Sequence, residues 1–247
     1  MIEIFGVKKQ FNGKQVLTGI NLTIKDGETL AIIGRSGCGK SVLLKHIVGL
    51  LMPDEGDVLV EGESITKCDL KTLYSIRRKF GFLFQGAALF DSLTVEENVS
   101  LPLIENEYNF SPEQIKQMVE EQLELVGLPG TEKLKPAELS GGMKKRISLA
   151  RSLITNPKYI LYDEPTTGLD PIMSDSIDEL ILNLSKKLNV TSVVVTHDMF
   201  SVQNVASKIA MVHEGKIYFT GTPKELMDSN DEVLVNFIKR TGFKIEN

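Results

Sequence analysis

Residues 34–41 read Gly34-Arg35-Ser36-Gly37-Cys38-Gly39-Lys40-Ser41, a glycine-rich loop between two apolar segments. Residues 29–33 before the loop predict a buried strand, and residues 42–48 after it predict a helix. Glycines let the backbone curl around an anion, and the helix N-terminus adds unpaired N–H donors with roughly +0.5 of a charge. We expect Lys40 to reach the outer phosphates of a nucleotide and the Ser41 hydroxyl to ligate Mg²⁺. Glycine clusters also form simple turns, but this context predicts a site for ATP or GTP.

The composition is that of an ordinary globular protein. The chain has 247 residues, of which 42% are hydrophobic and 25% charged, and this suits one large α/β domain or two small ones. Its net charge of −5 argues against a protein that binds nucleic acid by neutralising phosphates. No membrane-spanning stretch or signal peptide is recognisable, and Cys38 and Cys68 lack a metal-type spacing. We therefore expect a cytosolic protein.

Strands are predicted in the first third and in the last third of the chain. Residues 2–7 and 16–24 predict a pair of strands joined by a turn at Asn12-Gly13, and further strands are expected at 57–60 and 79–84. Later strands at 159–162 and 193–195 alternate with a helix, which predicts a parallel sheet with helices packed on it. A hairpin is expected over residues 208–219, and a last helical region after Thr222.

The middle of the chain is predicted to be helical. Residues 93–128 have a helical pattern, and Ser111-Pro112-Glu113-Gln114 forms a capping box with proline at the first helical position. Another helix is expected to start after Ser140 and to run through Ile154. We therefore expect one α/β domain over residues 1–247, with a helical insert near residues 90–158.

Polar residues follow the apolar strands at three places: the glycine-rich loop, Asp163-Glu164 and Thr196-His197-Asp198. Ligand sites in open α/β sheets lie at the carboxyl ends of strands, so these clusters can share one crevice. Asp163 can hold a metal ion opposite Ser41, and Glu164 can polarise a water in line with the γ-phosphate, which is typically worth ~10²–10⁴-fold in rate. A lone histidine is more often structural, but the position of His197 at a strand end predicts a functional role. Gln85, which follows another strand, could contact the metal and its water.

A second anion site is predicted at Leu139-Ser140-Gly141-Gly142-Met143, where a bare glycine backbone precedes a helix. This segment has no counterpart of Lys40, and one triphosphate does not need two such cradles from one chain. We expect a dimer in which each nucleotide lies between the loop of one copy and the Ser-Gly-Gly segment of the other.

The order and spacing of these motifs resemble the ATP-binding-cassette (ABC) ATPase family over essentially the whole chain. The resemblance implies an α/β P-loop NTPase fold with a RecA-like parallel-sheet core, an N-terminal antiparallel β subdomain and a helical insert. It also implies hydrolysis of ATP to ADP and phosphate, because each catalytic position of the family holds a competent residue here.

The resemblance implies a role for each motif residue. Phe11 stands where the family usually has a tyrosine that stacks on adenine, and Met143 stands where glutamine is commoner. Gln85 resembles the glutamine that senses the metal and couples to a membrane partner, and Ser41, Gln85 and Asp163 are the implied metal ligands. The other resemblances are the Walker A loop (Gly34, Arg35, Ser36, Gly37, Cys38, Gly39, Lys40 and Ser41), the signature (Leu139, Ser140, Gly141, Gly142 and Met143), the Walker B aspartate Asp163, the catalytic glutamate Glu164, the D-loop Gly168-Leu169-Asp170 and the switch histidine His197.

The family includes three functional classes that these motifs would fit. A chromosome-organising ATPase needs long heptad repeats between the Q-loop and the signature, and the segment from Gln85 to Ser140 is too short for them. Translation factors of the family resemble two fused cassettes, whereas one is recognised here. The ATPase subunit of a transporter with a separate membrane chain is therefore favoured. Lys144-Lys145-Arg146 is interpreted as a solvated helix face rather than a patch for lipid headgroups.

Among transporter ATPases, the sequences of residues 84–103, 139–144 and 162–172 are similar to those of the Mla-type lipid-trafficking ATPases. That similarity implies phospholipid transport across or between envelope membranes, together with a second copy of the chain, a permease and an MCE-domain lipid-binding protein, and no nucleic acid. The implied location is peripheral, on the cytoplasmic face of the inner membrane. The alternative is the ATPase of an importer for amino acids or another small solute.

Overall fold

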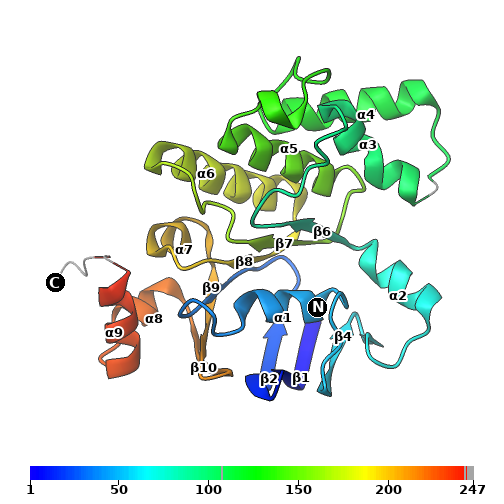
Figure 1. Ribbon diagram of the computed structural model, residues 1–247. Coiled ribbons are helices and arrows are strands. Elements are labelled where there is room, and N and C mark those ends of the chain that lie inside the picture. The colour runs from blue at the N-terminus through cyan, green and yellow to red at the C-terminus, as the bar shows by residue number, and fades with distance from the viewer. Residues whose placement is uncertain (107, 242, 244–247) are drawn as a thin grey trace.

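The computed structural model describes residues 1–106, 108–241 and 243, and two sheets form its framework (Figure 1). The smaller sheet contains β1 (Ile2–Phe11), β2 (Lys14–Ile24), β4 (Glu55–Val60) and β5 (Glu63–Ser64), in the order β2-β1-β4-β5. The larger sheet contains β3 (Thr29–Ile33), β6 (Phe80–Leu83), β7 (Tyr159–Asp163), β8 (Thr191–Val195), β9 (Lys208–His213) and β10 (Lys216–Gly221). Its strand order is β10-β9-β3-β8-β7-β6.

The strand directions confirm the predicted fold class. All pairs in the smaller sheet are antiparallel, whereas β9, β3, β8, β7 and β6 of the larger sheet run parallel. Only β10 is antiparallel there, as half of the hairpin predicted over residues 208–219. Ile32 and Asp163 both pair with Val195, so β3, β8 and β7 end level with one another. The segments that follow these three strands therefore emerge side by side.

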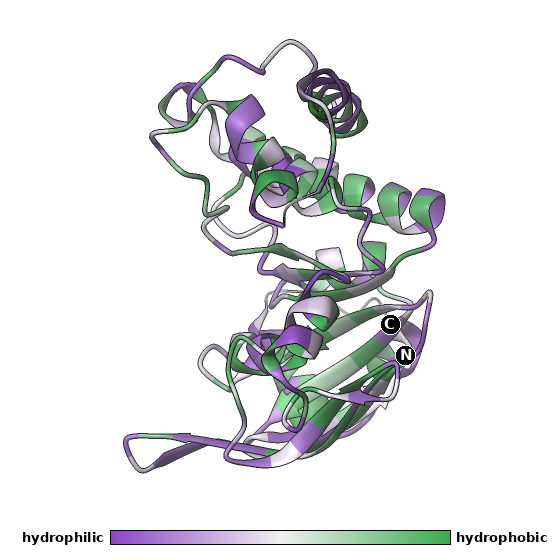
Figure 2. Ribbon diagram, turned by 90° about the vertical axis from the view of Figure 1, so that its right-hand side faces the viewer, coloured by the Kyte–Doolittle hydropathy of each residue, from purple (hydrophilic) through white to green (hydrophobic). Residues whose placement is uncertain are grey.

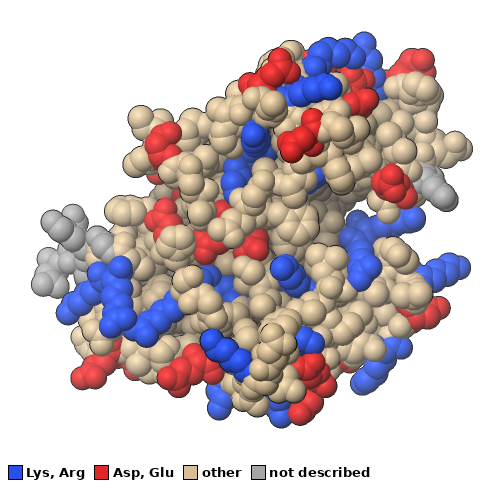
Figure 3. Space-filling view, in the orientation of Figure 1, with Lys and Arg blue, Asp and Glu red and all other residues tan. Residues whose placement is uncertain are grey.

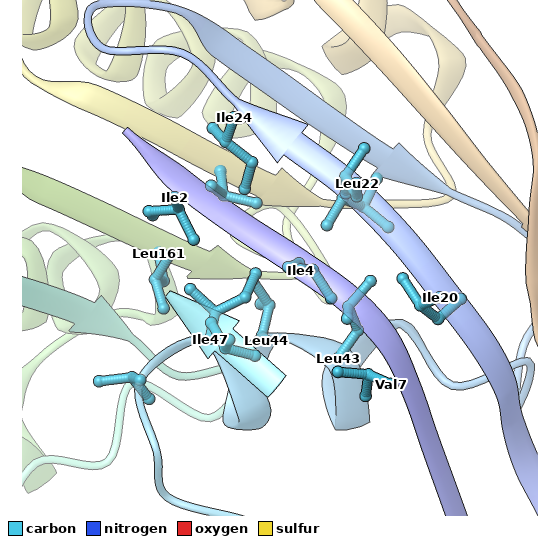
Figure 4. Packing of buried hydrophobic residues seen from close by; sticks show 14 of the residues in the cluster. Ile2, Ile4, Val7, Ile20, Leu22, Ile24, Leu43, Leu44, Ile47 and Leu161 are labelled. Atoms are coloured by element: carbon cyan, nitrogen blue, oxygen red, sulfur yellow. The ribbon is translucent and has the colours of Figure 1, made fainter. Parts of the chain in front are cut away.

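Helix α1 (Lys40–Ile47) is buried between the two sheets (Figure 4). Leu43, Leu44 and Ile47 of α1 pack against the inward side chains of β1 and β2, and Leu161 of β7 belongs to the same cluster. Each of these helix side chains is fully buried, which is worth about 1.5–3 kcal/mol per residue. The packing fixes the position of the loop that precedes α1.

The other helices surround these elements. They are α2 (Leu70–Arg77), α3 (Val95–Glu105), α4 (Pro112–Leu125), the short 3₁₀ helix η1 (Pro136–Glu138), α5 (Gly141–Leu153), α6 (Pro171–Leu188), α7 (Met199–Val205), α8 (Pro223–Met227) and α9 (Glu232–Arg240). One apolar cluster joins α3–α6 to β6, β7 and β8, and another joins α7, α8 and α9 to β3 and β9. Hydrophobic residues dominate the strands, while hydrophilic residues gather on loops and outer helix faces (Figure 2). Within the described residues, no helix is both long and apolar enough to cross a membrane.

The structure differs from the sequence prediction in several elements. The predicted helical stretch over residues 93–128 is two helices, because the chain leaves α3 after Glu105 and re-enters a helix at the predicted capping box of Ser111. The first hairpin is longer than predicted, and Asn12 and Gly13 form its turn with φ of 49° and 78°. Helices α2 and α7 are additional to the prediction, and they have only eight and seven residues.

Asp178 is an acidic side chain in the contact between α6 and α7. It is only 2% exposed, and one of its carboxylate oxygens has no hydrogen-bond partner among the described residues. Burial raises the pKa of Asp178 to about 6, and the negative charges of Asp198 and Asp175 add to the increase. Because the pKa is raised above its unfolded value, the folded state loses stability as the pH increases from about 4 through 6.

We expect Asp178→Asn to stabilise the protein at pH 8, because the amide removes the cost of ionising a buried carboxylate. The raised pKa corresponds to a gain of roughly 2–3 kcal/mol in the free energy of unfolding, and the gain should disappear near pH 4. Urea denaturation at the two pH values measures it. Glu179→Gln, at the exposed neighbouring position, is the control and should show no such pH dependence. An equal effect of Asp178→Asn at both pH values would contradict the prediction.

Candidate nucleotide-binding site

The glycine-rich loop connects the end of β3 to the N-terminus of α1, and two glycines give it its shape. Gly34 has φ of 149°, and a Cβ atom there would lie 2.5 Å from the carbonyl oxygen of Val212 and 2.7 Å from Cys38 Sγ. Gly39 is the N-cap of α1 with φ of 103°, and no side chain caps the helix. The first N–H groups of α1 are therefore available to an anion.

Lys40 extends across this loop rather than into solvent. Its side chain is buried, and Nζ donates hydrogen bonds to the carbonyl oxygens of Gly34 at 2.9 Å and Arg35 at 3.4 Å. The same Nζ lies 3.8 Å from Glu164 Oε1. An ammonium group is thus held between the loop and a carboxylate, where it can contact a phosphate with little rearrangement.

Ser41 and Asp163, which are 122 residues apart in sequence, are in direct contact. The Ser41 hydroxyl donates a hydrogen bond of 2.7 Å to Asp163 Oδ1 at the buried end of β7. Hydroxyl and carboxylate oxygens suit Mg²⁺. Within residues 1–106, 108–241 and 243, no group of three or more His, Cys, Asp or Glu side chains could hold a metal ion. A magnesium ion at Ser41 and Asp163 would therefore need further oxygens, such as those of phosphates or water.

Glu164 is held in an unusual conformation directly after Asp163. Its φ is 51°, and its N–H donates to the carbonyl oxygen of Val195 at 2.9 Å. Carboxylate Oε2 lies 2.8 Å from His197 Nδ1 and accepts a hydrogen bond of 3.2 Å from the Thr167 hydroxyl. A left-handed non-glycine residue costs of order 1–3 kcal/mol and is typical of functional sites. The arrangement can bind a water molecule and accept its proton.

A cleft of about 800 Å³ brings most of the predicted residues together. The predicted residues that line it are Phe11, Gly34, Arg35, Ser36, Gly37, Gly39, Lys40, Ser41, Gln85, Glu164 and His197. Phe11 is partly exposed, with Lys9 Nζ 5.7 Å from its ring centroid, and can serve as a platform for a base. Cys38 is not among the lining residues; its N–H donates to the Arg35 carbonyl oxygen. Asp163 does not line the cleft either, but it accepts a hydrogen bond from Ser41, which does.

The cleft also contains residues that the sequence analysis missed. Val16 and Val42 flank the loop, whereas Phe237, Arg240 and Thr241 come from the end of α9 and the residue after it. No sequence motif surrounds the residues of α9. Only the packing of that helix beside the loop brings them there.

The signature segment and Asp170 are not part of this cleft. Ser140 is the N-cap of α5 and accepts a hydrogen bond from the Met143 N–H, while Gly141 is exposed and Gly142 is covered by Met173. Asp170 is the N-cap of α6 and accepts from the Met173 N–H at 3.0 Å. These residues lie away from the cleft, and all of them except Gly142 are at least partly exposed.

The interpretation of residues 144–146 as a solvated helix face is wrong for Lys145 and Arg146. Lys145 is 5% exposed, and its Nζ donates to backbone oxygens of Gln85 and Glu164. Arg146 donates to the Val126 carbonyl oxygen and to the Ser176 hydroxyl. A run of charges gave no indication of this, because the acceptors lie on segments distant in sequence.

Comparisons with known proteins place the fold and motifs in one family. The profile of the ABC transporter family matches residues 17–167. The chain is 40% identical over 234 residues to the "Probable ribonucleotide transport ATP-binding protein mkl" of Mycobacterium tuberculosis, covering 95% of this chain and 65% of that protein. It is also 40% identical over 240 residues to the "Intermembrane phospholipid transport system ATP-binding protein MlaF" of Haemophilus influenzae, covering 97% of this chain and 90% of that protein.

A solved structure supports the same assignment. The dimeric post-hydrolysis state of the ATP-binding cassette MJ0796, bound to ADP and Pi, matches with a TM-score of 0.83 and 35% identity, covering 90% of this chain and 99% of that one. The chain therefore belongs to the ABC transporter family. It spans 65% of the length of the Mycobacterium tuberculosis relative.

We expect Gly34→Ala to destabilise the protein, because the added methyl group would meet the Val212 carbonyl oxygen and because φ is left-handed. The free energy of unfolding should decrease by more than ~1 kcal/mol. Thermal unfolding followed by circular dichroism measures the effect. Gly86→Ala is the matched control, since a Cβ at Gly86 meets nothing within 4 Å. An unchanged melting temperature for Gly34→Ala would contradict the geometry of the loop.

Proposed function

We propose that the chain is the ATP-binding and ATP-hydrolysing subunit of an ABC transporter that moves phospholipid or another lipid through a separate permease. The observation that carries the proposal is the meeting of Lys40, Ser41, Asp163, Glu164 and His197 at the ends of three parallel strands. Membership of the ABC transporter family supports the same activity.

Each lining group has a role in binding ATP. The base stacks on Phe11, and the phosphates lie over the loop formed by residues 34–41 at the N-terminus of α1, whose members other than Cys38 line the cleft. Ser41, Asp163 and the Gln85 side chain would hold Mg²⁺, and the bound ion would neutralise charge that develops on the phosphates.

Glu164 and His197 carry the chemical step. The Glu164 carboxylate orients a water molecule toward the γ-phosphate and accepts its proton, help that is typically worth ~10²–10⁴-fold. His197 Nδ1 and the Thr167 hydroxyl fix the carboxylate orientation through contacts of 2.8 and 3.2 Å. The Lys40 ammonium, 3.8 Å from Glu164, contributes positive charge beside the reacting phosphate.

Two copies close around two ATP molecules. Ser140, Gly141, Met143 and Asp170 lie outside the cleft of their own chain and are at least partly exposed, so they can contact the nucleotide held by a second copy. Gly142 belongs to the same segment, and it would be reached once the Met173 side chain that covers it moves. The dimeric cassette bound to ADP and Pi, 35% identical to this chain, supports the arrangement. Because both copies would contact ATP only when closed, ATP shifts the population toward the closed dimer.

A groove at the edge of the larger sheet is the proposed contact with the permease. It encloses about 480 Å³ between α2, the segment after β6 and α3. Aromatic side chains such as Phe84 and Phe90 line it beside Arg77, Arg78 and Arg151. Figure 3 shows basic side chains bordering a hollow on this side of the molecule. A permease helix with both apolar and acidic residues would complement this groove.

The lipid substrate and its partners are inferred from similarity. The relative named as the ATP-binding protein of an intermembrane phospholipid transport system covers 97% of this chain at 40% identity. An MCE-domain lipid-binding protein is the further proposed partner. The complex would place this chain peripherally on the cytoplasmic face of the inner membrane. An importer of amino acids or another small solute is the alternative.

Glu164→Gln tests the catalytic assignment. We expect ATP binding to persist, hydrolysis to decrease by ~10²–10⁴-fold, and a dimer to accumulate in the presence of ATP, because closure persists when hydrolysis is slow. Steady-state phosphate release and light scattering are the measurements. A Glu164→Gln variant that stays monomeric at saturating ATP would argue strongly against the scheme.

Lys40→Ala tests the role of the loop in nucleotide binding, and ATP binding and phosphate release are measured as for Glu164→Gln. The variant should lose nucleotide affinity, because it removes the ammonium that faces the phosphates. Normal affinity of Lys40→Ala for ATP would overturn the assignment of the loop.

Purification with the native membrane partners, followed by mass spectrometry of proteins and lipids, tests the transport assignment. We expect phospholipid and an MCE-domain chain to copurify. A solute-binding protein in their place would favour the small-solute importer.

A further inference from the structure

Side chains on one face of α5 donate hydrogen bonds to the backbone of the segment that follows β6. Lys145, Ser148 and Arg151 are spaced by three residues, so they share a helix face. Lys145 Nζ donates to the Gln85 carbonyl oxygen, and the Ser148 hydroxyl donates to the Ala87 carbonyl oxygen at 2.7 Å. Arg151 donates to the carbonyl oxygens of Ala87 at 3.1 Å and Ala88 at 2.8 Å. Three side chains thus clamp residues 85–88.

The clamped segment requires such support. Ala87 and Ala88 have φ of 61° and 51°, a left-handed conformation that is costly for alanine. Their carbonyl oxygens have left the sheet and need other donors. The side chains of α5 supply these donors and hold the segment in its strained shape.

Lys145 makes a second contact that the other two residues do not make. Its Nζ also lies within 3.4 Å of the Glu164 backbone oxygen, at the end of β7. The ammonium therefore joins the backbone of Gln85 to the backbone of Glu164, and these are the residues proposed to contact the metal and the attacking water. Its positive charge also faces the carboxylates of Asp163 and Glu164.

Burial of this ammonium group is costly, which argues against a packing role. An apolar side chain of similar length would fill the same space without that penalty. Burial lowers the pKa of Lys145 from its ordinary value, which is the signature of this penalty. The compensating contacts are the carbonyl oxygens of Gln85 and Glu164, so the group is placed where it fixes these two strand ends relative to each other.

We propose that Lys145 is a positioning residue for ATP hydrolysis, which sets the separation of Gln85 and Glu164 by bonding to both of their backbone oxygens. The inference rests on the roles proposed above for these two residues. Arg151, on the same helix face, lines the proposed permease groove. Helix α5 thereby connects that groove to the backbone of Glu164 through side chains that bond to one segment, residues 85–88.

Lys145→Met tests the proposal, because methionine keeps the length of the side chain but cannot donate. We expect kcat to decrease by about 10- to 100-fold, as a small misplacement of reacting groups produces, while the affinity for ATP stays unchanged. Lys145→Arg, which keeps charge and donors, should restore most of the activity. Lys187→Met makes the same chemical change on the exposed end of α6 and is the control. ATP turnover and equilibrium binding of a fluorescent ATP analogue are measured on each folded variant.

Two results would overturn the proposal: unchanged kcat in folded Lys145→Met, or equal losses of kcat and ATP affinity. If Lys145→Met does not fold, amide hydrogen exchange of the wild-type protein tests whether the two segments are linked. Backbone amides within residues 85–88 and 163–167 should then open with one common free energy, and independent opening of the two segments would contradict the link. Glu164→Gln keeps the tests separate, since full activity of that variant would refute the proposed function rather than the role of Lys145.

Discussion

The burial of α1 between the two sheets is the packing on which the site depends. Leu43, Leu44 and Ile47 anchor the helix against strands that come from both sheets, so its N-terminus cannot move independently of β3 (Figure 4). Because the glycine-rich loop lies between two fixed elements, its N–H groups stay preorganised for an anion. The uncapped helix N-terminus and the buried Lys40 are consequences of that placement.

Strand register then brings the other polar groups to the loop. The strands β3, β8 and β7 are neighbours and end level with one another, because Ile32 and Asp163 both pair with Val195. Glu164 and His197 therefore emerge beside Ser41, although they are separated from it by more than a hundred residues of sequence. Glu164 has a left-handed backbone conformation, and its carboxylate contacts His197. If the three strands ended at different levels, these groups would not meet.

Much of the candidate site could be predicted from the sequence because its signals are local. Glycines at positions of unusual backbone conformation, an apolar strand before Asp163 and a capping box at Ser111 each act within a few residues. The pairing of Ser41 with Asp163 followed from the rule that parallel strands end at one edge. The interruption of the helical segment over residues 93–128 is harder to predict, because no glycine or proline marks the break after Glu105.

The sequence by itself determined the glycine-rich loop, the order of strands and helices, and the identity of the polar groups at the strand ends. These features follow from local backbone preferences and from the periodicity of apolar residues. Only the tertiary structure decided which of these groups meet. It buried Lys145 against Gln85 and Glu164, placed Arg240 of α9 in the cleft, and kept Ser140 and Asp170 outside it. The physical reason is that burial and hydrogen bonding depend on neighbours brought together by packing, which a single run of residues does not specify.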